Sequence, residues 1–256
     1  MTAGAATADY IIEASALTKT FFGFDAVKDV DLKVRRHSIH ALIGPNGAGK
    51  TTTFNLITKF LRPSSGTIRY NGEDITSLRP EQVARRGIVR SFQISAVFPR
   101  MTVRENVRIA LQRPLGNSYR FWQSEKALKA LDGRIDELLD QVGLLAYSER
   151  PATLLSYGRK RALEIATTLA LDPEMLLLDE PTSGLGHEDV DRIAELIRRV
   201  SANRTILMVE HNLSVVAALS DTITVLALGR VLAEGDYQTV SQDHRVIEAY
   251  IGGTDD

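Results

Sequence analysis

A glycine-rich stretch, GPNGAGKTT at residues 44–52, has the residue types and the spacing of a phosphate-binding loop. It matches the pattern G-x-x-x-x-G-K-[ST], which begins here at Gly44 and ends at Gly49, Lys50 and Thr51. Glycines let the backbone point its N–H groups at phosphate oxygens without a Cβ in the way. Lys50 would supply a cation for the β- and γ-phosphates, and the Thr51 hydroxyl is a suitable ligand for Mg²⁺.

Two polar pairs each follow a short apolar run. Asp179 and Glu180 follow MLLL, and Glu210 and His211 follow TILMV. In phosphate-loop nucleotide sites a carboxylate at a strand end holds Mg²⁺, usually through water, and a second carboxylate beside it orients or deprotonates the attacking water. Carboxylates at strand ends are common on protein surfaces, so the phosphate loop about 130 residues earlier is what favours the functional interpretation.

These residues need elements that bring them to one place. Residues 38–43 form an apolar run typical of a buried strand, and TTTFNLITKFL after the loop has helical spacing. Further alternation of buried strands and helices predicts an α/β fold with a mainly parallel sheet and helices on both faces. Ligands of such sheets lie at the carboxyl ends of the strands. The residues just past predicted strand ends are Gly44, Gln93, Asp179, Glu180 and His211.

Residues 10–34 predict short strands joined by a turn at Gly23, in an antiparallel β layer. Phe21, Phe22 and Phe24 crowd that turn. Core or hairpin packing is the simpler expectation for each of them, although one aromatic there would suit stacking on a purine. Further hairpins are expected at Asn71-Gly72 and at Gly229.

Residues 94–150 predict an inserted helical subdomain. Thr102 and Glu105 form a capping-box pattern, and residues 125–142 carry apolar side chains at helical spacing. Three aromatic residues are expected in the core of this subdomain: Tyr119, Phe121 and Trp122.

The composition is that of an ordinary globular protein, with 256 residues, 44% hydrophobic and 25% charged. A net charge of −1 gives no general attraction to nucleic acid. The absence of cysteine excludes disulfides and thiolate metal sites and fits a reducing cytoplasm. No apolar run approaches the length of about 18 residues that a membrane span needs, and the N-terminus lacks the pattern of a secretion signal.

LSYGR at residues 155–159 precedes a predicted helix, so Ser156 and Gly158 would present donors to an anion. On local physics alone, an ordinary N-cap serine and a turn glycine are enough to explain these two residues. Six motifs in order, however, give the chain a resemblance to the nucleotide-binding subunit of ATP-binding cassette (ABC) transporters over nearly its whole length. They resemble Walker A (GPNGAGKT, 44–51), the Q-loop (RSFQ, 90–93), the signature (LSYGR), Walker B (MLLLDEP, 175–181), the D-loop (SGLG, 183–186) and the switch histidine (His211).

The resemblance implies a phosphate-loop (RecA-like) core with its β layer at 8–93 and 160–237, a helical subdomain at 94–159 and a C-terminal tail at 238–256. It also implies a role for each matched residue. Phe21, or Phe22 if the register differs by one, stacks on adenine. The residues that cradle the ATP phosphates are Gly44, Pro45, Asn46, Gly47, Ala48, Gly49, Lys50, Thr51 and Thr52.

By the same resemblance, Thr51, Gln93 and Asp179 surround Mg²⁺, and Gln93 also senses a membrane partner. Glu180 activates water and His211 contacts the γ-phosphate. Ser156 and Gly158 act on ATP bound to the opposite subunit, which implies a head-to-tail dimer of identical or paralogous cassettes with two composite sites.

Tyr157 in the signature and the ending HRVIEAYIGG resemble the branch that serves branched-chain amino-acid importers. Importers of urea, amides and aromatic acids share much of this pattern. The resemblance implies an ATPase at the cytoplasmic face of the plasma (inner) membrane, bound to permease subunits and acting indirectly with a periplasmic or extracellular solute-binding protein. A soluble, non-transport ABC ATPase is the alternative of a different class, but the chain has one cassette, no heptad run and balanced charge.

The remaining charged residues predict surface or structural roles. The run Arg159-Lys160-Arg161 is expected to be a solvated helix face. Four histidines show no paired metal-ligand spacing and are expected to be surface or hydrogen-bonded structural residues: His37, His40, His187 and His244.

Overall fold

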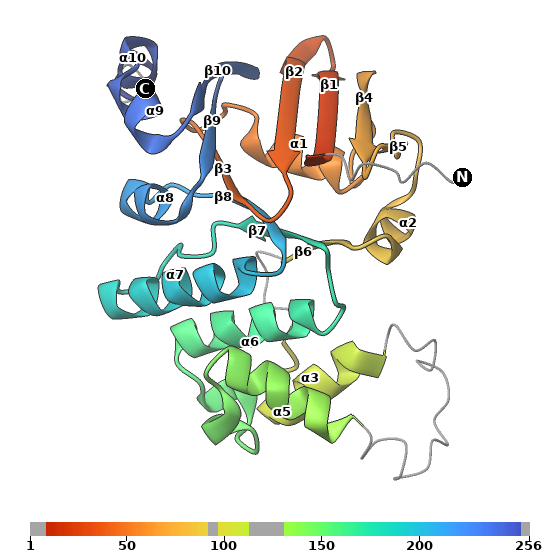
Figure 1. The fold of residues 1–256 in the computed structure, drawn as a ribbon, viewed down its shortest axis with the longest axis vertical. Helices are drawn as coiled ribbons and strands as arrows, with labels where there is room; N and C mark the ends of the chain where they lie inside the picture. The colour runs from red at the N-terminus through yellow and green to blue at the C-terminus, as the bar shows by residue number, and fades with distance from the viewer. Residues whose placement is uncertain (1–8, 92–96, 113–130, 252–256) are drawn as a thin grey trace, which may run out of the picture.

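The computed structural model describes residues 9–91, 97–112 and 131–251. Two β-sheets and a group of helices stack on one another (Figure 1). The central sheet has the strand order β10-β9-β3-β8-β7-β6, and the second sheet has the order β2-β1-β4-β5. The strands of the central sheet are β3 (Ile39–Ile43), β6 (Ile88–Arg90), β7 (Met175–Asp179), β8 (Thr205–Val209), β9 (Thr222–Ala227) and β10 (Arg230–Gly235).

The central sheet is mainly parallel, as the sequence predicts. β9, β3, β8, β7 and β6 pair in parallel, and β10 joins the edge through the expected antiparallel hairpin at Gly229. Every residue of β3, β7 and β8 is buried. These strands are mostly apolar because both faces of the sheet are covered.

The second sheet is the predicted antiparallel layer. It consists of β1 (Tyr10–Phe21), β2 (Phe24–Arg35), β4 (Ser65–Tyr70) and β5 (Glu73–Asp74). Gly23 and the pair Asn71-Gly72 form the expected turns, with positive φ angles. Helix α1 (Lys50–Ile57) shares one apolar core with both sheets through Phe54 and Leu56. One face of the central sheet is therefore covered by a helix and a β layer together.

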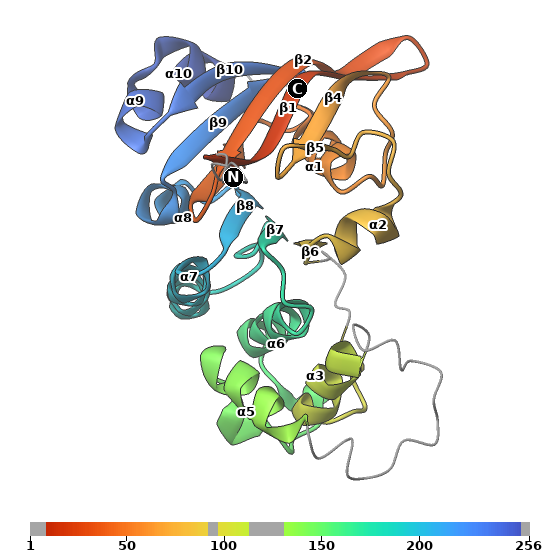
Figure 2. The ribbon, with the colours of Figure 1, turned by 45° about the vertical axis from the view of Figure 1, so that its right-hand side comes forward.

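Helices cover the other face of the central sheet (Figure 2). α6 (Tyr157–Leu169), α7 (His187–Ser201) and α8 (Leu213–Leu219) share a second apolar core with it. α3 (Val103–Gln112) and α5 (Asp132–Gln141) pack on α6, away from the sheets. The remaining α-helices described are α2 (Pro80–Arg85), α9 (Tyr237–Gln242) and α10 (His244–Ile251).

The predicted capping box begins α3. The Thr102 N–H donates to Glu105 Oε2 at 2.7 Å, and the Glu105 N–H donates to Thr102 Oγ1 at 3.1 Å. Of the helix expected over residues 125–142, the structure places 132–141 in α5. Tyr119, Phe121 and Trp122 lie outside the described residues. Within the described ranges, no helix combines the length and the apolarity needed to cross a bilayer.

Candidate functional site

The carboxyl ends of β3, β7 and β8 meet at one edge of the central sheet. Val209, the last residue of β8, is in register with Leu42 on one side and with Asp179 on the other. The residues that follow these strands therefore lie at the same edge, where α/β sheets bind their ligands. They include Gly44, Glu180 and His211, as the strand pattern predicts. Gln93 lies outside the described residues.

The phosphate loop connects β3 to α1 and requires glycine at both of its ends. Gly44 has φ +148°, and a Cβ there would lie 2.1 Å from the carbonyl oxygen of Leu226. Gly49 has φ +100°, and a Cβ there would lie 2.6 Å from the carbonyl oxygen of Ala26. The loop is thus packed against β2 and the β9–β10 hairpin, and a side chain at either glycine would displace backbone.

Lys50 lies at the start of α1 and is held by the loop itself. Its Nζ donates to the carbonyl oxygens of Gly44 at 2.7 Å and Pro45 at 2.8 Å. Burial lowers the pKa of the Lys50 ammonium, and the nearby charge of Glu180 opposes this effect. The geometry places a cation beside backbone N–H groups at a helix N-terminus, which is a site for an anion such as phosphate.

Asp179 ends β7 and is buried, with 2% of its surface exposed. Its carboxylate is paired with Arg90, the last residue of β6. Arg90 also donates to Asn55 Oδ1 of α1 at 2.6 Å. Sequence reasoning assigned Arg90 no role of its own, because the end of β6 at Arg90 and its place beside β7 are visible only in the structure.

Glu180 and His211 come together from two strand ends. His211 Nε2 lies 3.1 Å from Glu180 Oε1. Glu180 has φ +46°, a left-handed conformation that is uncommon for a residue with a side chain. Such conformations persist where the surrounding contacts determine them, and they concentrate at functional sites.

Glu210 is a second residue whose role sequence reasoning missed. It is 2% exposed, and one carboxylate oxygen accepts from the N–H and the hydroxyl of Thr182. The other oxygen accepts from the N–H groups of His211 at 2.8 Å and Asn212 at 3.1 Å. Glu210 therefore joins the segment after Glu180 to the loop that carries His211. Its position at the end of an apolar strand is the same signal that singled out Asp179.

Ser156 and Gly158 lie at the start of α6. Ser156 is the N-cap residue, and its Oγ accepts from the N–H of Arg159 at 3.4 Å. A Cβ at Gly158 would lie 2.3 Å from Asp189 Cγ, so the glycine allows α6 and α7 to pack closely. In the part of the chain that the structure describes, no hydrogen bond links either residue to the phosphate loop of the same copy.

The phenylalanines at the β1–β2 turn are exposed. The exposed fraction is 37% for Phe21, 109% for Phe22 and 70% for Phe24. Of the expected core or hairpin packing, the core alternative is therefore wrong for Phe22 and Phe24, because the turn projects beyond the core of the two sheets. An exposed aromatic surface of this kind is available to a planar base.

Comparison with known proteins places the chain in a family. The family model described as ABC transporter matches residues 27–183, and the model described as branched-chain amino acid ATP-binding cassette transporter matches residues 230–256. The high-affinity branched-chain amino acid transport ATP-binding protein BraF of Pseudomonas aeruginosa is 38% identical over 252 residues, which cover 94% of this chain and 98% of that protein. The chain belongs to the ABC transporter family.

Other ABC proteins agree with this assignment. The high-affinity branched-chain amino acid transport ATP-binding protein LivG of Escherichia coli is 39% identical over 254 residues, covering 94% of this chain and 98% of that protein. The crystal structure of a nucleotide-free ATP-binding cassette from an ABC transporter has a TM-score of 0.83 and 30% identity, covering 95% of this chain and 99% of that chain. This ABC protein is thus an ATP-binding subunit and an ATPase.

The ABC signature helix differs from its prediction at one residue. Arg161 was expected on a solvated helix face with Arg159 and Lys160, but it is only 9% exposed. It points into the molecule and donates to the carbonyl oxygen of Asp179 at 2.7 Å. Three consecutive basic residues suggest an exposed face. Successive residues of a helix point in different directions, however, and of these three only Arg161 is turned inward.

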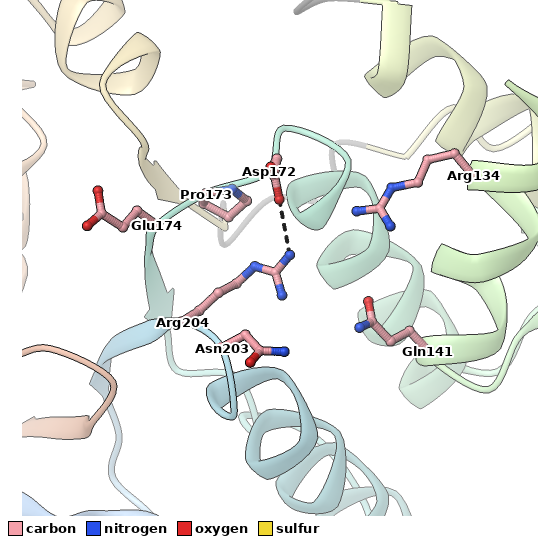
Figure 3. A pocket seen from close by; sticks show the side chains of 7 residues that line it. All are labelled: Arg134, Gln141, Asp172, Pro173, Glu174, Asn203 and Arg204. Carbon is pink, nitrogen blue, oxygen red and sulfur yellow. Dashed lines mark hydrogen bonds and ion pairs between the residues drawn. The ribbon is translucent and has the colours of Figure 1, made fainter.

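A polar crevice of about 430 Å³ lies away from these motifs of the ABC cassette (Figure 3). It is found at the amino ends of β7 and β8, opposite the edge that carries the phosphate loop. Arg204 donates there to Asp172 Oδ1 at 3.3 Å. None of the predicted site residues lines it, and its lining residues are Arg134, Gln141, Asp172, Pro173, Glu174, Asn203 and Arg204.

Proposed function

We propose that this ABC ATPase binds MgATP between two cassettes and uses its hydrolysis to import branched-chain amino acids. The observation that carries the catalytic part is the convergence of Lys50, Glu180 and His211 at one sheet edge, with His211 3.1 Å from Glu180. Phosphoryl transfer needs positioning and charge neutralisation more than covalent chemistry. The loop amides and Lys50 would hold the phosphates, while Glu180, positioned by His211, would orient or deprotonate the attacking water.

The residues present fit Mg²⁺, because Thr51 and Asp179 offer oxygen ligands that this hard cation prefers. Gln93 would complete this set. The described residues contain no group of three or more His, Cys, Asp or Glu that could hold a metal ion. A cation here would therefore take its other ligands from phosphate and water. When bound, Mg²⁺ would neutralise charge on the β- and γ-phosphates.

A second cassette would complete each site. Ser156 and Gly158 present a helix N-terminus, yet they share no hydrogen bond with the phosphate loop of their own copy within the described residues. We infer that they contact the nucleotide of a partner cassette, identical or paralogous. A dimeric structure of a post-hydrolysis state of an ATP-binding cassette bound to ADP and Pi supports this inference, with a TM-score of 0.72 and 25% identity.

A permease subunit would dock on the loop that precedes α3. Phe98 and Met101 of this loop expose 50% and 37% of their surface, and Leu154 of the segment bonded to it exposes 71%. Hydrogen bonds hold the loop in place. The N–H of Ala152 donates to the Met101 carbonyl at 2.9 Å. The Phe98 N–H donates to Asn106 Oδ1, and Asn106 Nδ2 donates to the Phe98 carbonyl. Gln93 lies shortly before this loop in the chain and would carry the state of the nucleotide to it.

The proposed solute and the proposed location of this subunit are inferred from the names of its relatives. BraF and LivG are named for branched-chain amino acid transport, and the matching C-terminal family model carries the same name. We therefore favour leucine, isoleucine and valine over urea, amides or aromatic acids, with a solute-binding protein outside the membrane and this subunit on its cytoplasmic face. A soluble, non-transport role is not favoured by these relatives.

The test is uptake by proteoliposomes that contain the cassette, its permease subunits and the solute-binding protein. We expect ATP-dependent uptake of labelled leucine but not of urea, and loss of uptake and ATPase activity with Lys50→Ala. Replacing Phe98 and Met101 with serine should abolish uptake while basal ATPase activity persists. Uptake of urea in place of leucine would refute the solute, and full activity of Lys50→Ala would refute the site.

A further inference from the structure

A buried arginine of α6 holds the backbone around Glu180. Nη2 of Arg161 donates to the carbonyl oxygens of Asp179 at 2.7 Å and Glu180 at 3.1 Å. Its Nε donates to the carbonyl oxygen of Pro181 at 3.2 Å. One guanidinium group thus binds three consecutive carbonyls of the segment that carries the predicted catalytic carboxylate.

The guanidinium is itself fixed from the same helix. Nη1 of Arg161 donates to Glu164 Oε2 at 2.7 Å, and the two residues are 9% and 7% exposed. A guanidinium group with five donors suits this arrangement, because a lysine ammonium has three donors and cannot bond a carboxylate and three carbonyls at once. Glu164 orients the arginine and compensates its buried charge.

These contacts coincide with an unusual backbone. Glu180 has φ +46°, and its N–H donates to the carbonyl oxygen of Val209 at 2.9 Å. The N–H is held by β8 and the carbonyl by Arg161. A left-handed residue is retained where neighbouring groups fix it on both sides. The direction of the Glu180 side chain therefore depends on where α6 places Arg161.

α6 also begins with Ser156 and Gly158, five and three residues before Arg161. Less than two turns of one hydrogen-bonded helix separate these residues, so a displacement of its N-terminus would also displace Arg161. We propose that Arg161, oriented by Glu164, is a positioning residue that links contact with the partner's nucleotide to the placement of Glu180 in the same subunit. This inference rests on the proposed function, in which α6 faces the nucleotide of a second cassette.

The test compares Arg161→Met and Arg161→Lys with Lys160→Met, a control on the same helix that removes a neighbouring positive charge. The measurements are the melting temperature, the Kd for ATP, and kcat, KM and the Hill coefficient for ATP hydrolysis. We expect Arg161→Met to lower kcat about 10- to 100-fold with Kd changed less than about threefold, and the Hill coefficient to fall toward that of independent sites. Arg161→Lys should lower kcat and the Hill coefficient nearly as much as Arg161→Met does, and Lys160→Met should match the wild type.

If Arg161→Met does not fold, Glu164→Gln takes its place, because it keeps an acceptor of the same size while removing the charge that orients Arg161. Its expected signature is a lower kcat and Hill coefficient at unchanged Kd, with a lower melting temperature because the buried charge of Arg161 loses its partner. Wild-type kcat and cooperativity in the folded variant would overturn the positioning role. A wild-type chain that neither binds nor hydrolyses ATP would instead refute the proposed function, so the two failures are distinct.

Discussion

At the scale of single residues, the sheet edge that carries the phosphate loop is organised by buried carboxylates whose hydrogen-bond donors come from different segments of the chain. Glu210 accepts from Thr182, His211 and Asn212. Asp179 is paired with Arg90. A buried carboxylate is stable in its charged form only where such donors surround it, and their loss leaves several polar groups unpaired at once.

Replacing Glu210 with alanine should therefore destabilise the protein and slow its ATP hydrolysis. We expect the free energy of unfolding to fall by about 3 kcal/mol, because buried donors lose their acceptor. ATP hydrolysis should fall as well, since the loop of His211 loses its anchor. Urea denaturation and ATPase assays measure the two effects. The control is Glu188→Ala, an acid whose side chain is 81% exposed and pairs only on the surface with Arg192. Equal stability of the two variants would contradict the prediction.

His40 gives the protein a pH-dependent stability. It is 1% exposed, and burial lowers its pKa from 6.5 to about 4. Its Nε2 lies 2.8 Å from Thr224 Oγ1, and that hydroxyl donates to Glu234 at 2.6 Å. The single hydroxyl proton goes to Glu234, so neutral His40 donates from Nε2 to Thr224. The expected role as a hydrogen-bonded structural histidine is confirmed.

Because the unfolded chain binds a proton at His40 more readily than the folded one, stability falls as the pH drops from 6.5 toward 4 and is unaffected above that range. The shift corresponds to about 3 kcal/mol at the acid end. Urea denaturation at a series of pH values should show a flatter profile for His40→Gln than for the wild type. The control is His187→Gln, at an exposed histidine, and its free energy of unfolding should change with pH as the wild type's does. Parallel profiles for wild type and His40→Gln would exclude this contribution.

At the scale of elements, the phosphate loop owes its shape to a distant hairpin. The N–H of Gly229, between β9 and β10, donates to the Ala48 carbonyl at 3.1 Å, and the Leu226 carbonyl occupies the space beside Gly44. The glycines of the loop are thus unequal. Gly44 and Gly49 face backbone, whereas nothing lies within 4 Å of a Cβ placed on Gly47.

This difference predicts unequal effects of two alanine substitutions. Gly47→Ala adds a strained φ of +76° in open space and should cost about 1 kcal/mol. Gly44→Ala adds a clash with the Leu226 carbonyl and should cost about 2–4 kcal/mol. ATP affinity should fall further for Gly44→Ala, since the loop must shift. Thermal unfolding and ATP titration would measure both variants, and a larger effect at Gly47 would disprove the packing argument.

At the scale of the whole molecule, the central sheet separates two apolar cores. One lies against α1 and the antiparallel layer, and the other lies against α6, α7 and α8. The phosphate loop belongs to the first side and the start of α6 to the second. A single copy therefore presents the phosphate loop and the start of α6 on different parts of its surface, and the proposed head-to-tail pair would bring them together.

The dimer should consequently depend on ATP and on α6. We expect Glu180→Gln, which keeps the size of the side chain but removes the base, to bind ATP, hydrolyse it poorly and run as a dimer in light scattering. Adding Ser156→Arg should keep ATP affinity and return the protein to a monomer, because a bulky cation would block the partner's nucleotide. A dimer of Glu180→Gln that forms equally well without ATP would contradict this prediction.

The sequence alone determined the parts of this protein that depend on local geometry. Gly44, Gly49 and Lys50 are separated by a fixed short spacing, and parallel strands necessarily align their carboxyl ends, so the phosphate loop and the edge it shares with Glu180 and His211 were predictable. The antiparallel layer and its turns followed from residues in adjacent positions.

Only the tertiary structure decided which charges are buried and what they hold. Arg161 lies in a basic run that resembles a solvated face, and Phe22 lies in an aromatic run that resembles a core, yet Arg161 is buried and Phe22 is exposed. Pairs such as Arg90 with Asp179 join segments about 90 residues apart. Burial and pairing of this kind depend on how distant elements pack, and no spacing along the chain encodes that packing directly.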